Sequence, residues 1–447
     1  MVALSSELVS RYDRPGPRYT SYPPVPRWST EPSDRAWHDL VEQLGRPTAL
    51  YVHVPFCKER CVYCGCNMVV SRRQAAGDRF LDALDRQSAE VPPLRLQWIH
   101  LGGGTPTWLD PRQIRRLFSI VGRVGSRRSD CEVSVEVDPM VTTDERLEAL
   151  LEQGTRRLSI GVQSLDPTVL DAVDRPQSPE HIEQLVVLAR DGGIDSLNVD
   201  LMTGLPHQTP DTLGKTIASV LRWRPERLSV FGYAHVPWLK RHQRAIDTDA
   251  LPGSEERAEL RLLAHQRLVA AGYVAIGFDH YAKPDDALAR SLRDDTLGRN
   301  FMGYTPYRGL PVIALGPSAI SEVDGSFVQL EPHLGRWYEA VEQGRMPVVR
   351  AYRGSANDHR NAWIIESILC RGGVAASEIR DRFGRLPDTW GASLDRLAPL
   401  VEDGLVRLTA DQVLVTEAGR FFLRVVAMAF DPTLAAEPSA GRYSRTV

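Results

Sequence analysis

The chain has 447 residues, of which 43% are hydrophobic and 25% are charged, as is typical of a globular enzyme with room for two or three domains. Its formal net charge of −3 gives no electrostatic reason to expect nucleic acid or an anionic membrane as a partner. No apolar stretch approaches the roughly 20 residues of a membrane-spanning helix, and the first residues lack the features of a signal peptide. We therefore expect a cytoplasmic protein that binds neither nucleic acid nor membrane.

After an irregular opening rich in proline, glycine and tyrosine, short apolar runs alternate with helical segments. Runs of this length, rich in branched residues, predict buried strands. The strands are expected at 49–54, 96–101, 132–137, 157–162, 196–202 and 227–233. The helices between them are expected at 76–90, 111–124, 143–153, 179–191 and 212–222.

This alternation indicates βα units around a parallel sheet, with functional residues at the carboxyl ends of the strands. Six units predict an α/β fold in the form of a partial (β/α)6 barrel rather than a closed eight-fold barrel. A helix at 254–270 and an apolar run at 273–278 are expected to extend it. We expect the barrel and its extension to span residues 46–350. Residues 1–45 are expected to form an N-terminal segment that lies over the active site.

The alternation stops near residue 351, and the rest of the chain is predicted to be mostly helical. Helices at 362–370, 376–383 and 390–403 precede two short strands at 405–408 and 413–415. Helices followed by a hairpin resemble a winged-helix module, but this stretch has no dense basic face. Residues 351–447 are therefore expected to form a substrate lid or packing domain rather than a DNA-binding one.

Four of the six cysteines lie within ten residues, directly after the first predicted strand: Cys57, Cys61, Cys64 and Cys66. This spacing is too tight for a disulfide framework and indicates a reducing location with thiols that serve a metal. The first three follow a C-x₃-C-x₂-C pattern, which matches neither a four-ligand ferredoxin nor a zinc site. Three thiolates can hold a [4Fe–4S] cluster with one iron open for chemistry. Cys131 and Cys370 are expected to be core residues.

A glycine run, Gly102-Gly-Gly-Thr-Pro106, follows the second predicted strand. Glycine permits positive φ and lets the backbone approach a ligand closely, although many such runs are only turns. The run lies one βα unit after the cysteines, so both are expected at the same mouth of the barrel.

The cysteine motif and the glycine run together resemble the radical S-adenosylmethionine (SAM) superfamily. Further stretches resemble, more closely, the oxygen-independent coproporphyrinogen III oxidases: 16–23 (GPRYTSYP), 51–57, 64–67, 134–139, 161–163, 198–201, 233–237, 279–280 and 318–320. The resemblance extends from about residue 10 to 325 and continues more weakly to the closing residues 442–446.

The resemblance implies that Cys57, Cys61 and Cys64 hold the cluster, with SAM chelated to the fourth iron. The positions that match SAM contacts, divided between two SAM molecules, are Tyr51, Tyr63, Gly103, Gly104, Thr105, Glu136, Gln163, Arg175, Asp200, Ala234 and Ile320. A carboxylate at a strand end can pair with an ammonium or ribose hydroxyls, and an arginine can fork onto a carboxylate.

Cys66 and His53 are the candidate catalytic residues. Cys66 is open to three interpretations: a transient fourth ligand, a thiol near the substrate, or a core residue. A role without ligation is expected, since a permanent fourth ligand would close the iron to SAM. His53 lies on the first strand beside the cysteine motif.

In the family's reaction, a radical removes a β-hydrogen from a propionate, and loss of an electron and CO₂ leaves a vinyl group. Two rounds on a small-molecule tetrapyrrole give protoporphyrinogen IX. A substrate with four carboxylates needs basic residues near the mouth. Candidates by position are Arg14, Arg18, Lys240, Arg241 and Lys283. A flavodoxin- or ferredoxin-type reductant is expected, and the chain is expected to act as a monomer.

Departures from the family lie on the substrate side. Met302 stands where some relatives carry a glutamine that touches the second SAM, and basic residues of close relatives are replaced at 360–363. An alternative function is therefore a SAM-dependent methyltransferase or cyclopropanase of secondary metabolism, which uses one SAM for the radical and another as carbon donor. A haem chaperone on the same scaffold is a further alternative. The Arg-Tyr-Thr-Ser-Tyr-Pro segment and Cys66 count against it, since those relatives usually lack the segment and carry an aromatic residue at that position.

Overall fold

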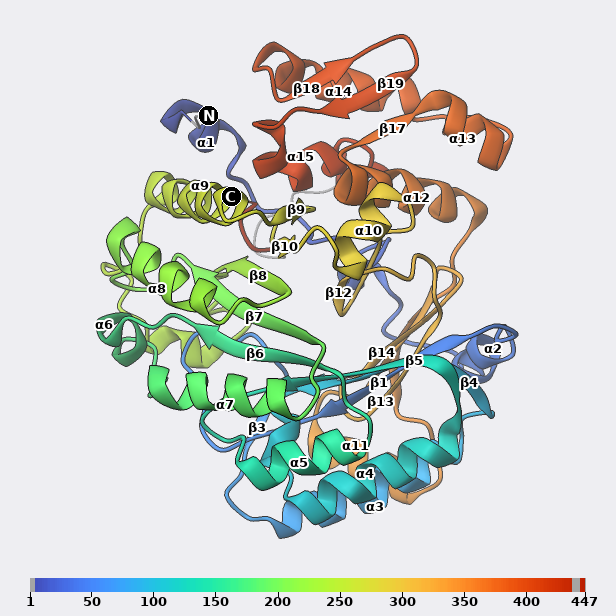
Figure 1. Ribbon diagram of the computed structural model, residues 1–447. Helices are drawn as coiled ribbons and strands as arrows, with labels where there is room; N and C mark the ends of the chain where they lie inside the picture. The colour runs from blue at the N-terminus through green and yellow to red at the C-terminus, as the bar shows by residue number, and fades with distance from the viewer. Residues whose placement is uncertain (1–4, 436–442, 447) are drawn as a thin grey trace.

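A curved, mostly parallel sheet forms the centre of the computed structural model, which describes residues 5–435 and 443–446 (Figure 1). Seven strands run parallel, in the order β13 (Val312–Leu315), β1 (Thr48–Val54), β4 (Leu94–Gly103), β5 (Gly125–Val137), β6 (Arg157–Gln163), β7 (Ser196–Thr203) and β8 (Arg227–Gly232). All six predicted strands are present, as β1 and β4 to β8, and the α/β fold is confirmed.

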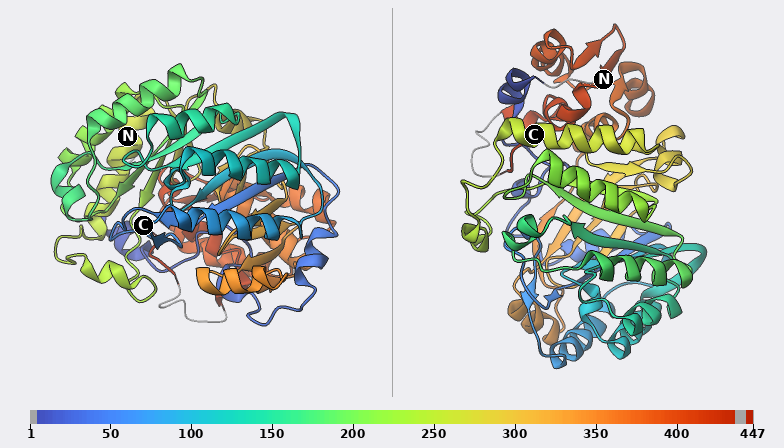
Figure 2. Two further views of the ribbon diagram at one scale, coloured as in Figure 1. Left: turned by 90° about the horizontal axis from the view of Figure 1, so that it is seen from below. Right: turned by 60° about the vertical axis from the view of Figure 1, so that its left-hand side comes forward.

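Helices connect these strands and cover the outer face of the sheet (Figure 2). They are α3 (Ala75–Ser88), α4 (Pro111–Val124), α5 (Asp144–Glu152), α6 (Pro167–Asp171), α7 (Pro179–Asp191), α8 (Pro210–Arg222) and α9 (Ser254–Ala270). Side chains of Asp110, Ser178 and Thr209 cap α4, α7 and α8, each followed by a proline at the first helical position. These local signals explain why the predicted bounds lie within a few residues of the observed ones.

Antiparallel strands extend both edges of the sheet, and the sequence did not predict most of them. Beside β13 lie β14 (Ile320–Val323), β15 (Ser326–Leu330) and β16 (Val348–Tyr352), and beside β8 lie β10 (His280–Ala282) and β9 (Val274–Ile276). The apolar run expected at 273–278 therefore forms only one strand of a short hairpin. Within the described residues β16 and β9 share no ladder, so the barrel is open.

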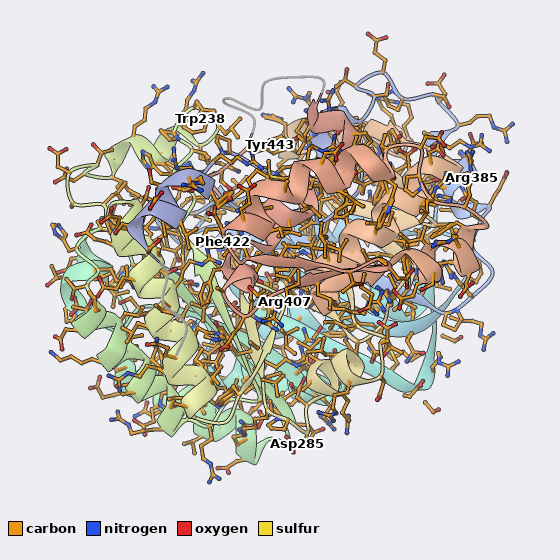
Figure 3. All side chains as sticks on the ribbon, turned by 90° about the horizontal axis from the view of Figure 1, so that it is seen from above. Trp238, Asp285, Arg385, Arg407, Phe422 and Tyr443 are labelled. Atoms are coloured by element: carbon orange, nitrogen blue, oxygen red, sulfur yellow. The ribbon has the colours of Figure 1, made fainter. Side chains whose placement is uncertain are left out.

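The C-terminal part lies beyond the β8–β10 end of the sheet, above α9 in Figure 1. It comprises α12 (Ala356–Arg371), β17 (Gly373–Ala375), α13 (Ala376–Phe383), α14 (Trp390–Glu402), β18 (Val406–Leu408), β19 (Gln412–Val415), α15 (Leu423–Met428) and α16 (Pro432–Ala435). The hairpin β18–β19 follows the helices as predicted, and β17 adds an unpredicted third strand to it. Phe422 lies among these helices (Figure 3) and is fully buried.

The N-terminal segment contains α1 (Ser6–Tyr12) and α2 (Ala36–Val41) and joins the two parts of the fold. Tyr12, Tyr19 and Tyr22 belong to the hydrophobic cluster of the C-terminal part, whereas Trp37 belongs to that of the sheet. Further elements are α10 (Ala287–Arg293), β11 (Gly298–Asn300), β12 (Gly303–Thr305) and α11 (Leu334–Glu342). No helix in the described ranges has the length and apolar character needed to cross a membrane. The three segment boundaries stay predictions.

A buried ion pair between β8 and α10 provides a test of this packing. Arg227 Nε lies 2.9 Å from Asp286 Oδ1, and the two side chains are 4% and 5% exposed. Asp286→Asn retains a good helix cap but leaves the guanidinium charge uncompensated. We expect it to lower the free energy of unfolding by about 3 to 5 kcal/mol, measured from the denaturant midpoint.

The matched control is Asp211→Asn, which breaks an exposed ion pair with Lys215. It should leave the midpoint at the wild-type value, because solvent already screens that pair. Equal shifts for the two variants would contradict the assignment.

Candidate active site

The three motif cysteines lie on the loop that follows β1, between the short strands β2 (Phe56–Cys57) and β3 (Val69–Val70). All three are free thiols, and all line one cavity of about 560 Å³ at the carboxyl end of the parallel strands. Cys57 Sγ lies 3.3 Å from Thr105 Oγ1, and Cys61 Sγ accepts a hydrogen bond of 3.3 Å from Arg175 Nη1. The loop therefore presents its thiols to a common space.

The glycine run lies directly against the start of this loop. Gly104 N donates to the Val54 carbonyl at 2.8 Å, and Thr105 N donates to the Phe56 carbonyl at 2.7 Å. A Cβ on Gly104 would lie 2.6 Å from the Phe56 carbonyl oxygen. Gly103 has φ +111°, and a Cβ there would lie 2.8 Å from the His53 ring. Both positions therefore require glycine.

Two carboxylates reach the same cavity from β5 and β7. Glu136 accepts from His100 Nε2 and from Gly103 N, each at 3.2 Å. Burial disfavours its charge, but these donors outweigh burial and hold its pKa below the usual value. Asp200 has a raised pKa because of burial and the nearby Glu136 charge, although Ser159 Oγ donates to it at 2.9 Å. Such opposed shifts in one cavity are typical of functional sites.

Arg175 holds the loop that carries the three cysteines, here called the thiol loop, at Cys61. Its guanidinium lies 3.5 Å from Asp138 Oδ2, contacts Cys61 and donates to the Gly161 carbonyl. Gln163, at the end of β6, has φ +65°, which is rare for a residue with a side chain and is associated with functional sites.

Most of the predicted site residues line this main cavity. They are Cys57, Cys61, Tyr63, Cys64, Cys66, Gly103, Gly104, Thr105, Glu136, Gln163, Arg175, Asp200 and Ala234. Tyr51, His53 and Ile320 instead line a second cavity of about 420 Å³. The two cavities share a wall made of Gly65, Cys66, Glu136 and Met302. All predicted residues are therefore brought together, but around two adjoining spaces.

His53 is held at this second cavity by hydrogen bonds on both ring nitrogens. Nδ1 lies 3.1 Å from the Tyr51 hydroxyl, and Nε2 lies 2.8 Å from the Asn67 carbonyl oxygen. Burial lowers the pKa of His53, which favours the neutral ring. Since the Asn67 carbonyl oxygen can only accept a hydrogen bond, Nε2 carries the proton when the His53 ring is neutral.

The basic candidates are divided. Arg18 and Lys240 line the main cavity, and Lys240 Nζ donates to the Cys66 carbonyl at 3.2 Å. Lys283 instead pairs with Glu226 at 3.0 Å, and Arg14 and Arg241 are exposed and do not line the cavity. Sequence reasoning missed other residues of the lining, among them His100, Arg157, Arg227, Tyr233, Gln243 and His280. Of these six, only Tyr233 directly follows the carboxyl end of a parallel strand, so that signal could have found Tyr233 but not the others.

The three cysteine thiols suit an iron–sulfur cluster better than a single metal ion. In the part of the chain that the structure describes, no three histidine, cysteine or acidic side chains converge as ligands of one metal ion would. An iron–sulfur cluster is larger and takes thiolates spaced around it. Burial raises the pKa of Cys57 to about 12, and a hydrogen bond from Cys66 lowers that of Cys64 to about 6. A bound metal deprotonates such thiols. The three cysteines therefore fit a [4Fe–4S] cluster.

Residues 51–220 match the Radical SAM superfamily, so the chain is a radical SAM enzyme, a class that uses a [4Fe–4S] cluster and SAM. It is 39% identical to the oxygen-independent coproporphyrinogen III oxidase of Bradyrhizobium diazoefficiens, over 96% of this chain and 97% of that protein. The corresponding protein of Salmonella typhimurium is 36% identical, over 98% of each chain. The chain belongs to the family of oxygen-independent coproporphyrinogen III oxidases.

A solved structure agrees with this assignment. The coproporphyrinogen III oxidase of Escherichia coli, described as a radical SAM enzyme, matches with a TM-score of 0.90 and 37% identity, over 93% of this chain and 98% of that one. The predicted family, fold and enzyme class are confirmed.

The contact between the glycine run and the thiol loop generates a prediction. Gly104→Ala places a methyl group against the backbone before Cys57, which cannot yield without displacing that residue. We expect the purified variant to lose most of its iron and sulfide after anaerobic reconstitution, measured per chain. Gly122→Ala is the control, because its Cβ meets nothing within 4 Å on the exposed side of α4. Full iron content in Gly104→Ala would refute the requirement.

Proposed function

We propose that this protein converts coproporphyrinogen III to protoporphyrinogen IX without oxygen, by oxidative decarboxylation of two propionates to vinyl groups. The observation that carries the proposal is the extent of the match. The named oxidases align over nearly the whole chain, including the N-terminal segment and the C-terminal part, and not only over the radical SAM region.

Cys57, Cys61 and Cys64 would hold the cluster, which supplies the electron that splits SAM into methionine and a 5′-deoxyadenosyl radical. The chain's own residues would orient SAM. Glu136 stays ionised and suits the SAM ammonium, while Asp200 suits the ribose hydroxyls. The amides of Gly103, Gly104 and Thr105 are already bonded to protein oxygens. Their role is therefore close approach rather than hydrogen bonding to SAM.

We further propose that two SAM molecules bind, because the residues predicted to contact SAM are divided between two adjoining cavities. Cys66 lies in the shared wall and would act near the substrate rather than as a ligand. Met302, in the same wall, can pack against a sulfonium but cannot supply the hydrogen bonds of an amide.

The proposal includes the setting of the reaction. A one-electron donor of the flavodoxin or ferredoxin type would reduce the cluster, and the chain would act as a monomer. None of the six cysteines, all within the described residues, forms a disulfide. This agrees with a reducing cytoplasm.

Product analysis tests the proposed reaction. Anaerobic incubation with coproporphyrinogen III, SAM and reductant should give protoporphyrinogen IX and CO₂, identified by mass spectrometry after oxidation to the porphyrin. SAM labelled with ¹³C in its methyl group is included. Transfer of the ¹³C label to the product would contradict the proposal and support the methyltransferase or cyclopropanase alternative. Haem binding without SAM cleavage would support a chaperone.

Alanine variants of the four clustered cysteines test the ligand assignment. Cys57→Ala, Cys61→Ala and Cys64→Ala each remove a cluster thiolate, so we expect little iron and no SAM cleavage. Cys66→Ala should keep the wild-type iron content while vinyl formation falls at least ten-fold, because the thiol lies in the wall between the cavities. Loss of iron in Cys66→Ala would instead identify a fourth ligand.

A further inference from the structure

A smaller chamber, of about 120 Å³, adjoins the main cavity between β8, α9 and the two ends of the chain. Arg18, Gly232, Tyr233 and Ala234 line both spaces. We call it the arginine chamber, because its lining includes five arginines: Arg18, Arg257, Arg261, Arg424 and Arg445. Asp279 is the only carboxylate among the described residues of that lining.

Three of the five arginines hold the chain ends together. Arg257 Nη2 and Arg445 Nε contact Asp13 Oδ2 at 2.9 Å and 2.6 Å. Arg424 donates to the Pro17 carbonyl at 3.1 Å and to the Arg445 carbonyl at 2.8 Å. These contacts give the three side chains a structural role.

The other two arginines keep most of their donors free. Arg18 donates to the Gly232 carbonyl at 3.2 Å. Arg261 lies 5.9 Å from the centre of the Phe421 ring and makes no hydrogen bond or ion pair with any residue that the structure describes. Burial lowers the pKa of both guanidinium groups. Each has five N–H donors in a rigid fork, so both can accept an anion.

Among the residues that the structure describes, positive charge exceeds negative charge around the chamber. Five guanidinium groups face the carboxylates of Asp13 and Asp279, and Asp279 already lies 2.7 Å from His280 Nδ1. Removing a charge from water without a partner costs free energy, so an anion that enters this space is favoured. A guanidinium fork matches a carboxylate in shape and charge.

We propose that the arginine chamber binds a carboxylate arm of the substrate through Arg18 and Arg261, while the substrate ring occupies the main cavity. The inference rests on the proposed function, which supplies a substrate with propionate arms. SAM also carries a carboxylate, but Glu136, Arg175 and Asp200, the charged residues predicted to contact SAM, line the main cavity and not the chamber. We therefore assign the carboxylate in the chamber to the substrate and not to SAM.

Arg261→Gln tests the proposal by binding rather than turnover. Loss of one charge-assisted contact should weaken coproporphyrinogen III binding about 10- to 100-fold, measured anaerobically by equilibrium dialysis. The dissociation constant of labelled SAM should stay at the wild-type value. A weakened SAM constant with unchanged coproporphyrinogen III binding would overturn the proposal and assign the chamber to SAM.

Binding of propionate alone tests the carboxylate site independently of the proposed reaction. Calorimetry should show saturable binding of propionate to the wild type, loss of that binding in Arg261→Gln and Arg18→Gln, and no binding of neutral propionamide. If propionate behaves this way but no vinyl product forms from coproporphyrinogen III, the carboxylate site stands and the proposed reaction falls.

Arg267→Gln is the matched control, because it removes an exposed arginine from the same helix, α9. It should bind both probes like the wild type, and an Arg261→Gln variant that behaves identically would overturn the proposal. Iron content and thermal midpoint check that each variant is folded. If Arg261→Gln does not fold, Arg261→Lys keeps the charge, loses the fork and should give an intermediate constant.

Discussion

The close approach of two strand ends is the constraint on which the site depends. Strands β1 and β4 are in register, with His53 opposite Gly102 and Val54 opposite Gly103. The thiol loop leaves one strand at the point where the glycine run leaves the other, and their backbones are joined by hydrogen bonds. Because Gly103 and Gly104 lack side chains, Cys57 can lie against Thr105 and face the cavity. The glycines thus set the position of the first thiol.

The remaining strands supply charge to the space that this contact opens. Parallel strands end at one edge of the sheet, so Glu136, Asp200 and Arg175 meet there from separate βα units. The chain ends close another side, where Asp13 pairs with Arg257 and Arg445. A radical enzyme must keep water and oxygen from its intermediates. A fold in which Asp13 and Arg445 meet beside the cavity suits that need.

Local sequence signals predicted the core of the fold and the parts of the site that lie in one motif. Caps and prolines mark the helices, and the cysteine and glycine motifs mark the loops. The strand β13 was missed because its four residues pair with β1, far away in the chain, and local periodicity does not encode such pairing. Arg261 was missed for a similar reason. It lies on a helix with exposed arginines such as Arg267, and only the tertiary fold turns it toward a cavity.

We infer that three thiolates leave one iron of the cluster open to SAM. Mössbauer spectroscopy of the chain reconstituted with ⁵⁷Fe tests it most directly, because each iron of the cluster contributes its own signal. We expect one iron that differs from the other three and changes its isomer shift when SAM is added. Four equivalent irons that do not respond to SAM would contradict ligation by three thiolates.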